Sequence, residues 1–370
     1  MSGASSNVGL KNCKGRITFM IHNDFRELME YAKSNNCSDI HITVGTNVAI
    51  RRYGELKIIE PAPSAEESRN MIYSFLEQDQ IERVSGGMDL DAGVMLWDGT
   101  RIRANIYHQR NNLAASIRIL NQTVPSFEEL LLPPVCKELA EMPRGLVLVT
   151  GPTGSGKSTT LASMVDYINR TTSRHVITIE DPIEYVYPHD KAMIHQREVG
   201  KDVPSFATAL RSALREDPDI ILVGEMRDYE TISAAITAAE TGHLVLSTLH
   251  TTSAAQTVER IIDATPLDGQ DQIRTQFSNV IRGVITQTLV PTADMDGRVV
   301  ATEIMLGTPA IGNLIRDKKT IQIPSSIQAG RAAGMHLLND DLASLVGRGR
   351  ITKEDAMWVS NDPAALDKMC

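Results

Sequence analysis

Short apolar runs alternate with amphipathic stretches through the second half of the chain, and this alternation predicts its fold. The amphipathic stretches repeat apolar residues at the spacing of one helix face, as in residues 206–214, which follow the capping residue Ser205. Uninterrupted apolar runs are typical of strands buried on both faces of a parallel sheet. These runs are residues 146–149, 176–179, 220–223 and 244–247. We therefore predict an α/β domain with a parallel sheet over residues 144–301.

The first part of the chain shows a different pattern, in which alternating strands surround one or two helices. Residues 101–107 and 114–120 alternate apolar and polar positions, and an Asp-Gly pair predicts a turn before the first of them. Asp24 fits the capping position of a helix. The apolar residues on one face of that helix are Phe25, Leu28, Met29 and Ala32. Residues 22–120 are therefore predicted to form a small α+β domain.

Three further segments complete the predicted organisation. Residues 1–21 begin with a polar stretch and are expected to be a flexible leader. Residues 121–143 are interrupted by prolines and include a capping box of Ser126 and Glu129, which together predict a linker. Residues 302–370 repeat apolar positions at helical spacing and predict a helical C-terminal region.

The sequence after the first apolar run matches the phosphate-binding pattern G-x-x-x-x-G-K-[ST]. Its residues are Gly151, Pro152, Thr153, Gly154, Ser155, Gly156, Lys157 and Ser158, and Thr159 follows in the next predicted helix. Strand, loop and helix stand in the order that the motif requires, so an ordinary glycine-rich turn is the weaker interpretation. We predict that the loop binds the phosphates of ATP, that Lys157 reaches the β- and γ-phosphates, and that the Ser158 hydroxyl binds Mg²⁺.

Charged residues follow the other predicted strands at their carboxyl ends, where open sheets of this kind bind ligands. Glu225 is predicted to be the base that activates water, although Gly224 departs from the simplest Walker B pattern, so a direct carboxylate–Mg²⁺ contact does not follow. Glu180 is predicted to be the second catalytic carboxylate, with a helix cap or a surface acid as the alternative. His250 is predicted to sense the γ-phosphate, although a lone histidine is more often structural, which is the interpretation favoured for His243.

Four arginines lie on or beside the two strands predicted in the first domain. They are Arg101, Arg103, Arg110 and Arg118. Since side chains alternate along a strand, Arg101 and Arg103 share one face of the sheet. Two interpretations stay open: a solvated, positively charged sheet face, or arginine fingers that reach a phosphate held by a neighbouring subunit.

Composition and charge exclude several classes of function. The net charge of −9 over 370 residues disfavours a general nucleic-acid binder, and no apolar run approaches the ~18 residues of a membrane span. The four cysteines are far apart and form no C-x-x-C pair, which favours reduced thiols over disulfides or a zinc site. Because no apolar signal segment stands near the start, we expect a cytoplasmic protein. The cysteine spacing and the acidic net charge lead us to expect no zinc and no nucleic-acid partner.

Four segments, taken in order, resemble the motifs of the secretion ATPase superfamily. They are residues 151–158, 179–185, 217–228 and 241–251, in the places of its Walker A motif, Asp box, Walker B motif and His box. From about residue 22 onward the chain is similar to the type IV pilus retraction ATPases of that superfamily. The resemblance implies a PAS-like N-terminal domain, a RecA-like ATPase core and a homohexameric ring. It also implies that Glu225 is catalytic and that Arg103 and Arg118 complete the ATP site of the neighbouring subunit.

The function implied by this resemblance is a motor that hydrolyses ATP to retract type IV pili in twitching motility. Its partner would be an inner-membrane platform protein, with pilin engaged indirectly, so the implied location is the inner face of the cytoplasmic membrane at the pilus base. The alternatives are an accessory retraction ATPase, a regulatory nucleotide-binding ring, an assembly or secretion ATPase and, least favoured, a nucleic-acid translocase. The missing C-x-x-C pair favours retraction, whereas Gly312 stands where the retraction signature helix usually carries arginine.

Overall fold

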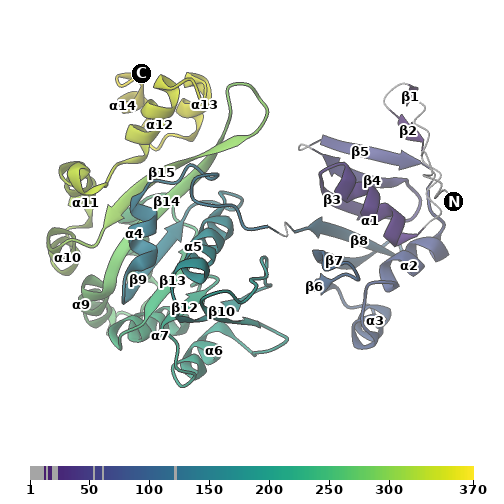
Figure 1. Ribbon diagram of the computed structural model, residues 1–370, viewed down its shortest axis with the longest axis horizontal. Helices are drawn as coiled ribbons and strands as arrows, with labels where there is room; N and C mark the ends of the chain where they lie inside the picture. The colour runs from purple at the N-terminus through teal and green to yellow at the C-terminus, as the bar shows by residue number, and fades with distance from the viewer. Residues whose placement is uncertain (1–11, 14–15, 19–23, 53–54, 61, 121–122) are drawn as a thin grey trace. The chain divides into compact units, whose positions relative to one another are not determined.

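The chain divides into two compact units, with the division after residue 122. The computed structural model describes residues 12–13, 16–18, 24–52, 55–60, 62–120 and 123–370 (Figure 1). Among these residues, no helix combines the length and the apolar composition that crossing a bilayer requires.

The first unit is built on one sheet whose strand order is β1-β2-β5-β4-β3-β8-β7-β6. Its strands are β1 (Asn12–Cys13), β2 (Arg16–Thr18), β3 (Cys37–Ile42), β4 (Val48–Arg52), β5 (Glu55–Glu60), β6 (Leu90–Met95), β7 (Arg101–Gln109) and β8 (Asn112–Ile119). Its helices are α1 (Phe25–Ser34), α2 (Ala65–Tyr73) and α3 (Gln78–Ser85). The described strands pair antiparallel, except for β2 and β5, which are parallel.

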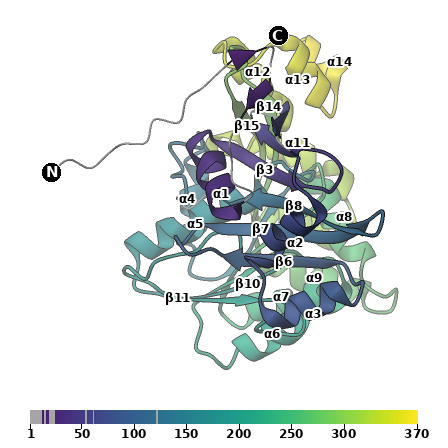
Figure 2. The ribbon, with the colours of Figure 1, turned by 90° about the vertical axis from the view of Figure 1, so that its right-hand side faces the viewer.

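Helix α1 forms where the sequence predicts it, because Asp24 accepts a hydrogen bond from the backbone N–H of Arg26. Its apolar face is buried in the core of the unit, and the predicted members of that face are all among the buried residues. In β7 the alternation also holds, since Ile102 and Ala104 are buried while Arg103 between them is half-exposed. Figure 2 shows α1 and α2 in front of the strands of their own unit.

Two segments differ from their sequence-based expectations. Most of the expected leader, 1–21, and residues 121–122 of the expected linker lie outside the described residues. Within the leader, however, β2 pairs with β5 and covers a strand edge that would otherwise leave backbone groups unpaired. Residues 123–143 belong to the second unit, because Phe127 and Leu139 are buried in its core.

The second unit contains a sheet with the strand order β11-β10-β12-β13-β9-β14-β15. Its strands are β9 (Gly145–Thr150), β10 (His175–Glu180), β11 (Met193–Glu198), β12 (Ile220–Val223), β13 (Leu244–Leu249), β14 (Ile281–Pro291) and β15 (Arg298–Leu306). Neighbouring strands are parallel apart from the β14–β15 pair, which is antiparallel. The four predicted runs form the neighbouring strands β10, β12, β13 and β9, so the predicted α/β class with a parallel sheet is confirmed.

Helices cover both faces of this sheet, and successive residues of a strand enter different cores. Val147 of β9 is buried with α4 (Val135–Glu141) and α5 (Lys157–Thr171), whereas Leu148 is buried in the core of the other face. That second core is completed by α6 (Phe206–Ala213), α7 (Tyr229–Glu240), α8 (Ala254–Asp263) and α9 (Gln270–Val280). Burial on both faces explains why these strands read as continuous apolar runs.

The chain ends in a helical region, as predicted, but the region begins later than residue 302. Residue 302 lies inside β15, which pairs with β14 along its whole length, so the expected boundary is wrong by several residues. The helices that follow are α10 (Pro309–Arg316), α11 (Ile323–Ala329), α12 (Leu338–Gly347), α13 (Lys353–Val359) and α14 (Pro363–Asp367). Leu342 of α12 is buried with Val290 of β14, so the last helices pack on the β14–β15 hairpin (Figure 1).

The turn from β15 into α10 packs closely on Ile281 at the start of β14, and this contact can be tested directly. A β-carbon at Gly307 would lie 2.0 Å from the carbonyl oxygen of Ile281, whereas one at Gly297, in the loop between β14 and β15, would meet nothing within 4 Å. We expect Gly307→Ala to lower the free energy of unfolding by about 2–3 kcal/mol, and Gly297→Ala to change it by less than about 0.5 kcal/mol. Denaturant unfolding followed by circular dichroism compares the two variants. Equal stability would mean that Ile281 moves away without cost.

Candidate nucleotide-binding site

The predicted phosphate-binding loop joins β9 to α5, and its glycines hold backbone conformations that other residues rarely adopt. Gly151 has a φ of 143°, and a β-carbon there would lie 2.2 Å from the carbonyl oxygen of Gln287 in β14. Gly156 has a φ of 87° at the capping position of α5. The loop therefore lies against β14 on one side and opens into the N-terminus of a helix, where backbone N–H groups favour an anion.

Lys157 is held inside the loop by two hydrogen bonds to loop carbonyls. Its Nζ atom donates to the carbonyl oxygens of Gly151 and Pro152, each at 2.9 Å. Burial lowers the pKa of Lys157, while the nearby carboxylates of Glu225 and Glu184 act in the opposite direction. The amino group is therefore placed at the mouth of the loop with weak, neutral acceptors, which a phosphate oxygen can replace.

The loop also fits a phosphate by the polar groups that it leaves unsatisfied. The Ser155 hydroxyl oxygen is buried, and no described atom forms a hydrogen bond with it. A buried hydroxyl without a partner costs free energy, so its presence indicates a ligand with acceptor oxygens. Ser158, the expected Mg²⁺ ligand, is exposed in the first turn of α5, and the Thr159 hydroxyl lies 3.2 Å from that of Tyr185.

Glu225 and His250, predicted separately from the sequence, are in contact in the structure. Glu225 follows β12 and His250 follows β13, which are neighbouring parallel strands. The Nε2 atom of His250 lies 3.4 Å from one carboxylate oxygen of Glu225, and a guanidinium nitrogen of Arg227 lies 2.5 Å from the other. The carboxylate is mostly buried, so these two residues fix its orientation.

Two hydrogen bonds orient the Glu180 carboxylate, one from its own strand β10 and one from β11. Its Oε1 atom accepts from the Thr178 hydroxyl at 2.6 Å and from the Gln196 side-chain amide at 3.1 Å. Burial raises the pKa of Glu180, and the neighbouring Glu184 acts in the same direction. Gln196 also donates to the Tyr185 carbonyl at 2.7 Å, so it connects Glu180 to the loop that follows β10.

His243 has the structural role favoured by the sequence. Its Nδ1 atom lies 2.9 Å from the carbonyl oxygen of Ala238, in the last turn of α7. A contact of this kind satisfies a carbonyl that the helix end leaves unpaired.

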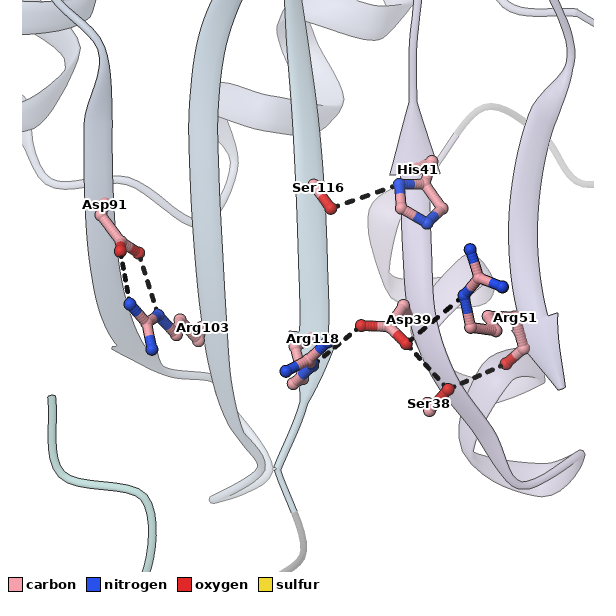
Figure 3. A network of polar contacts seen from close by, with 8 residues as sticks. All are labelled: Ser38, Asp39, His41, Arg51, Asp91, Arg103, Ser116 and Arg118. Atoms are coloured by element: carbon pink, nitrogen blue, oxygen red, sulfur yellow. Dashed lines mark hydrogen bonds and ion pairs between the residues drawn. The ribbon is translucent and has the colours of Figure 1, made fainter. Parts of the chain in front are cut away.

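Arg103 and Arg118 lie opposite each other on β7 and β8 of the first unit, and each is paired with a carboxylate (Figure 3). Arg103 makes two bonds to Asp91, at 2.7 and 3.2 Å, and Arg118 makes one to Asp39 at 2.9 Å. The Arg118 side chain remains 68% exposed. The sequence predicted that these two arginines lie on adjacent strands, but it did not predict their acidic partners.

Sequence reasoning missed one residue that contacts the loop directly. Gln287 of β14 is buried, and its side-chain amide donates to the carbonyl oxygen of Ser155 at 2.7 Å. The available signal was a long polar side chain between the apolar pairs Val284-Ile285 and Leu289-Val290. Buried polar groups require partners, so such a residue indicates a tertiary hydrogen bond.

Comparisons with known proteins relate the chain to ATPases of secretion and pilus systems. Residues 18–354 match the family described as type II/IV secretion system protein. A type IV pilus retraction ATPase, PilT, from Pseudomonas aeruginosa is 46% identical over 334 residues, which are 90% of this chain and 97% of the relative. A twitching motility protein from Neisseria gonorrhoeae is 49% identical over 308 residues, or 83% of this chain and 82% of the relative. The crystal structure of the pilus retraction motor PilT with bound ADP matches at a TM-score of 0.87 and 44% identity, over 93% of this chain and 99% of that chain.

The position of Lys157 leads to a prediction for nucleotide affinity. Lys157→Ala is expected to weaken ADP binding about ten- to a hundredfold, because a hydrogen bond to a charged group contributes about 1.5–3 kcal/mol. Isothermal titration calorimetry measures the change. Lys137→Ala is the control, because it removes the same charge from α4, where Lys137 pairs with Glu128. Wild-type affinity in Lys157→Ala would contradict the assignment of this lysine to the phosphates.

Proposed function

This chain belongs to the type II/IV secretion system protein family, and we propose that it is the ATPase motor that drives retraction of type IV pili. The observation that carries the proposal is the contact between Glu225 and His250 at the strand ends beside a complete phosphate-binding loop. This arrangement supplies both a phosphate site and a group that can take a proton from water. The direction of the motor rests on the likeness to the retraction ATPase and to the twitching motility protein.

Binding and proton transfer fall to different residues of this chain in the proposed hydrolysis. Lys157 exchanges the carbonyl oxygens of Gly151 and Pro152 for phosphate oxygens when ATP binds. Glu225, oriented by Arg227 and His250, accepts a proton from the attacking water.

Three further residues are placed around this reaction. His250 is positioned to respond to the γ-phosphate through its contact with the Glu225 carboxylate. Glu180 is the second carboxylate of the site; burial raises its pKa, and Glu184 acts in the same direction. The Ser158 hydroxyl would hold Mg²⁺, which neutralises charge on the β- and γ-phosphates when it is bound.

We place the chain in a homohexameric ring, with Arg103 and Arg118 completing the ATP site of a neighbouring subunit. What supports this is that both guanidinium groups remain accessible, since the side chain of Arg118 is 68% exposed and that of Arg103 is 42% exposed, so a phosphate could replace their carboxylate partners. Asp39 would keep contacts with Ser38 and Arg51 after Arg118 leaves it. The ring would act on an inner-membrane platform protein, and on pilin indirectly, at the cytoplasmic face of the pilus base.

One observation favours a second candidate, an accessory retraction ATPase that works beside another motor. Gly312 of α10 packs closely on α9, because a β-carbon there would lie 3.2 Å from the carbonyl oxygen of Ser278. The Arg316 guanidinium occupies the adjoining space and bonds to Ser278 and Asn279. A large side chain at position 312 would displace these contacts, so the surface of this helix differs from that of relatives with arginine there.

The role of Glu225 is tested by separating binding from hydrolysis. Glu225→Gln keeps the size of the side chain but removes the base, so we expect kcat to fall about 10²- to 10⁴-fold while ATP binding and ring assembly persist. Turnover assays and analytical ultracentrifugation measure the two properties. Glu230→Gln on the exposed side of α7 is the control. Retained turnover in Glu225→Gln would remove Glu225 from the role of base.

The direction of the motor is tested in cells that assemble type IV pili. Deletion of the gene is expected to leave excess surface pili and to abolish twitching, because subunits are added but not removed. Electron microscopy counts the pili, and surface-motility assays score twitching. Partial twitching would favour the accessory motor, whereas cells without pili would mean that the motor runs in the assembly direction.

A further inference from the structure

A buried glutamine in β14 joins the phosphate-binding loop to the helix that follows it. Gln287 is 2% exposed, and both ends of its side-chain amide are used. The Nε2 atom donates to the carbonyl oxygen of Ser155 at 2.7 Å, and Oε1 accepts from the Thr160 hydroxyl at 2.9 Å. One side chain therefore fixes a loop peptide and the first turn of α5 at the same time.

The first of these bonds determines where the next backbone donor points. A trans peptide directs its C=O and N–H groups to opposite sides. Because the Ser155 carbonyl points to Gln287 in β14, the N–H of Gly156 points away from β14. An unbonded carbonyl in a phosphate cradle would present negative charge to the ligand. The amide of Gln287 pairs with the Ser155 carbonyl, so this oxygen is not available to repel a phosphate.

The glycine at position 156, already favoured by its φ of 87°, also leaves room for this contact. A β-carbon there would lie 3.2 Å from the Nε2 atom of Gln287, which is closer than most real contacts of this kind. Without a side chain at 156, the amide lies directly beside the loop. The small residue at position 156 therefore makes room for the side chain of Gln287, although the two residues are far apart in the sequence.

We propose that Gln287 is a positioning residue for nucleotide binding: it presets the Ser155–Gly156 peptide and the start of α5 without touching the nucleotide. The inference rests on the proposed function, because it assigns this loop to ATP and ADP. It predicts that the loss of Gln287 weakens binding of both nucleotides, and so raises KM more than it lowers kcat. A residue that only filled the core would lower stability without that split.

The test compares Gln287→Met with a control in the full-length protein. Methionine has a similar length but neither donates nor accepts at these positions, so the Ser155 carbonyl and the Thr160 hydroxyl lose their partner. The control, Thr302→Val, alters the residue of β15 that pairs directly with Gln287, and it removes buried hydrogen bonds to His336 and Asp341, neither of which belongs to the loop. Thermal unfolding without nucleotide measures the stability that each variant loses.

Calorimetric titration with ADP and steady-state turnover with ATP give the deciding measurements. We expect Gln287→Met to weaken ADP binding about tenfold and to raise KM for ATP similarly, with kcat within about threefold of wild type. Thr302→Val should bind ADP as the wild type does. Wild-type affinity in Gln287→Met, or an equal loss in Thr302→Val, would overturn the inference.

One outcome separates this inference from the proposed function. A wild-type protein that binds ADP but hydrolyses no ATP would remove the motor assignment, while the ADP affinities would still decide the role of Gln287. If Gln287→Met fails to fold, Thr160→Val tests the second bond alone. It should weaken ADP binding about threefold, and Thr160→Ser should restore binding; unchanged affinity in Thr160→Val would overturn the inference.

Discussion

Burial of the parallel sheet on both faces is the constraint on which the second unit depends. Strands β9, β12 and β13 are covered along their length, so charged side chains can emerge only where a strand leaves the sheet. Parallel strands end at one edge, and this brings Glu225 and His250 together from separate segments. The same edge contains the phosphate-binding loop, because that loop is itself the end of β9. The position of the chemistry thus follows from how the core is buried.

Much of this arrangement could be predicted from the sequence, because local patterns specify it. The central strands are apolar runs, and α1 begins where Asp24 caps it. β14 was not predicted, because its polar residues resemble a loop until their partners are known. Gln287 is paired with groups 127 and 132 residues away in the chain. Only the tertiary fold can show that these polar groups are satisfied.

Within the two sites, too, some features could be predicted from the sequence and others could not. The phosphate-binding loop was predicted because its motif is continuous in the sequence. The hydrogen bond that Glu180 accepts from Gln196 was not, because it depends on the register in which β11 pairs with β10. In the first unit, Arg118 meets Asp39 through the pairing of β8 with β3. Strand register between distant segments is the information that a single sequence does not supply.

Strand β14 also has a mechanical consequence, because it is attached to two different parts of the second unit. Gln287 holds the phosphate-binding loop, and Val290 is buried with α12 and α14 only three residues further along. At about 3.3 Å per residue, the two attachments are ~10 Å apart on one hydrogen-bonded strand. Between these two attachments every residue of β14 is paired with β15, which limits bending of the segment. A displacement of the phosphate-binding loop along this strand would therefore reach the C-terminal helices through the β14–β15 hairpin itself.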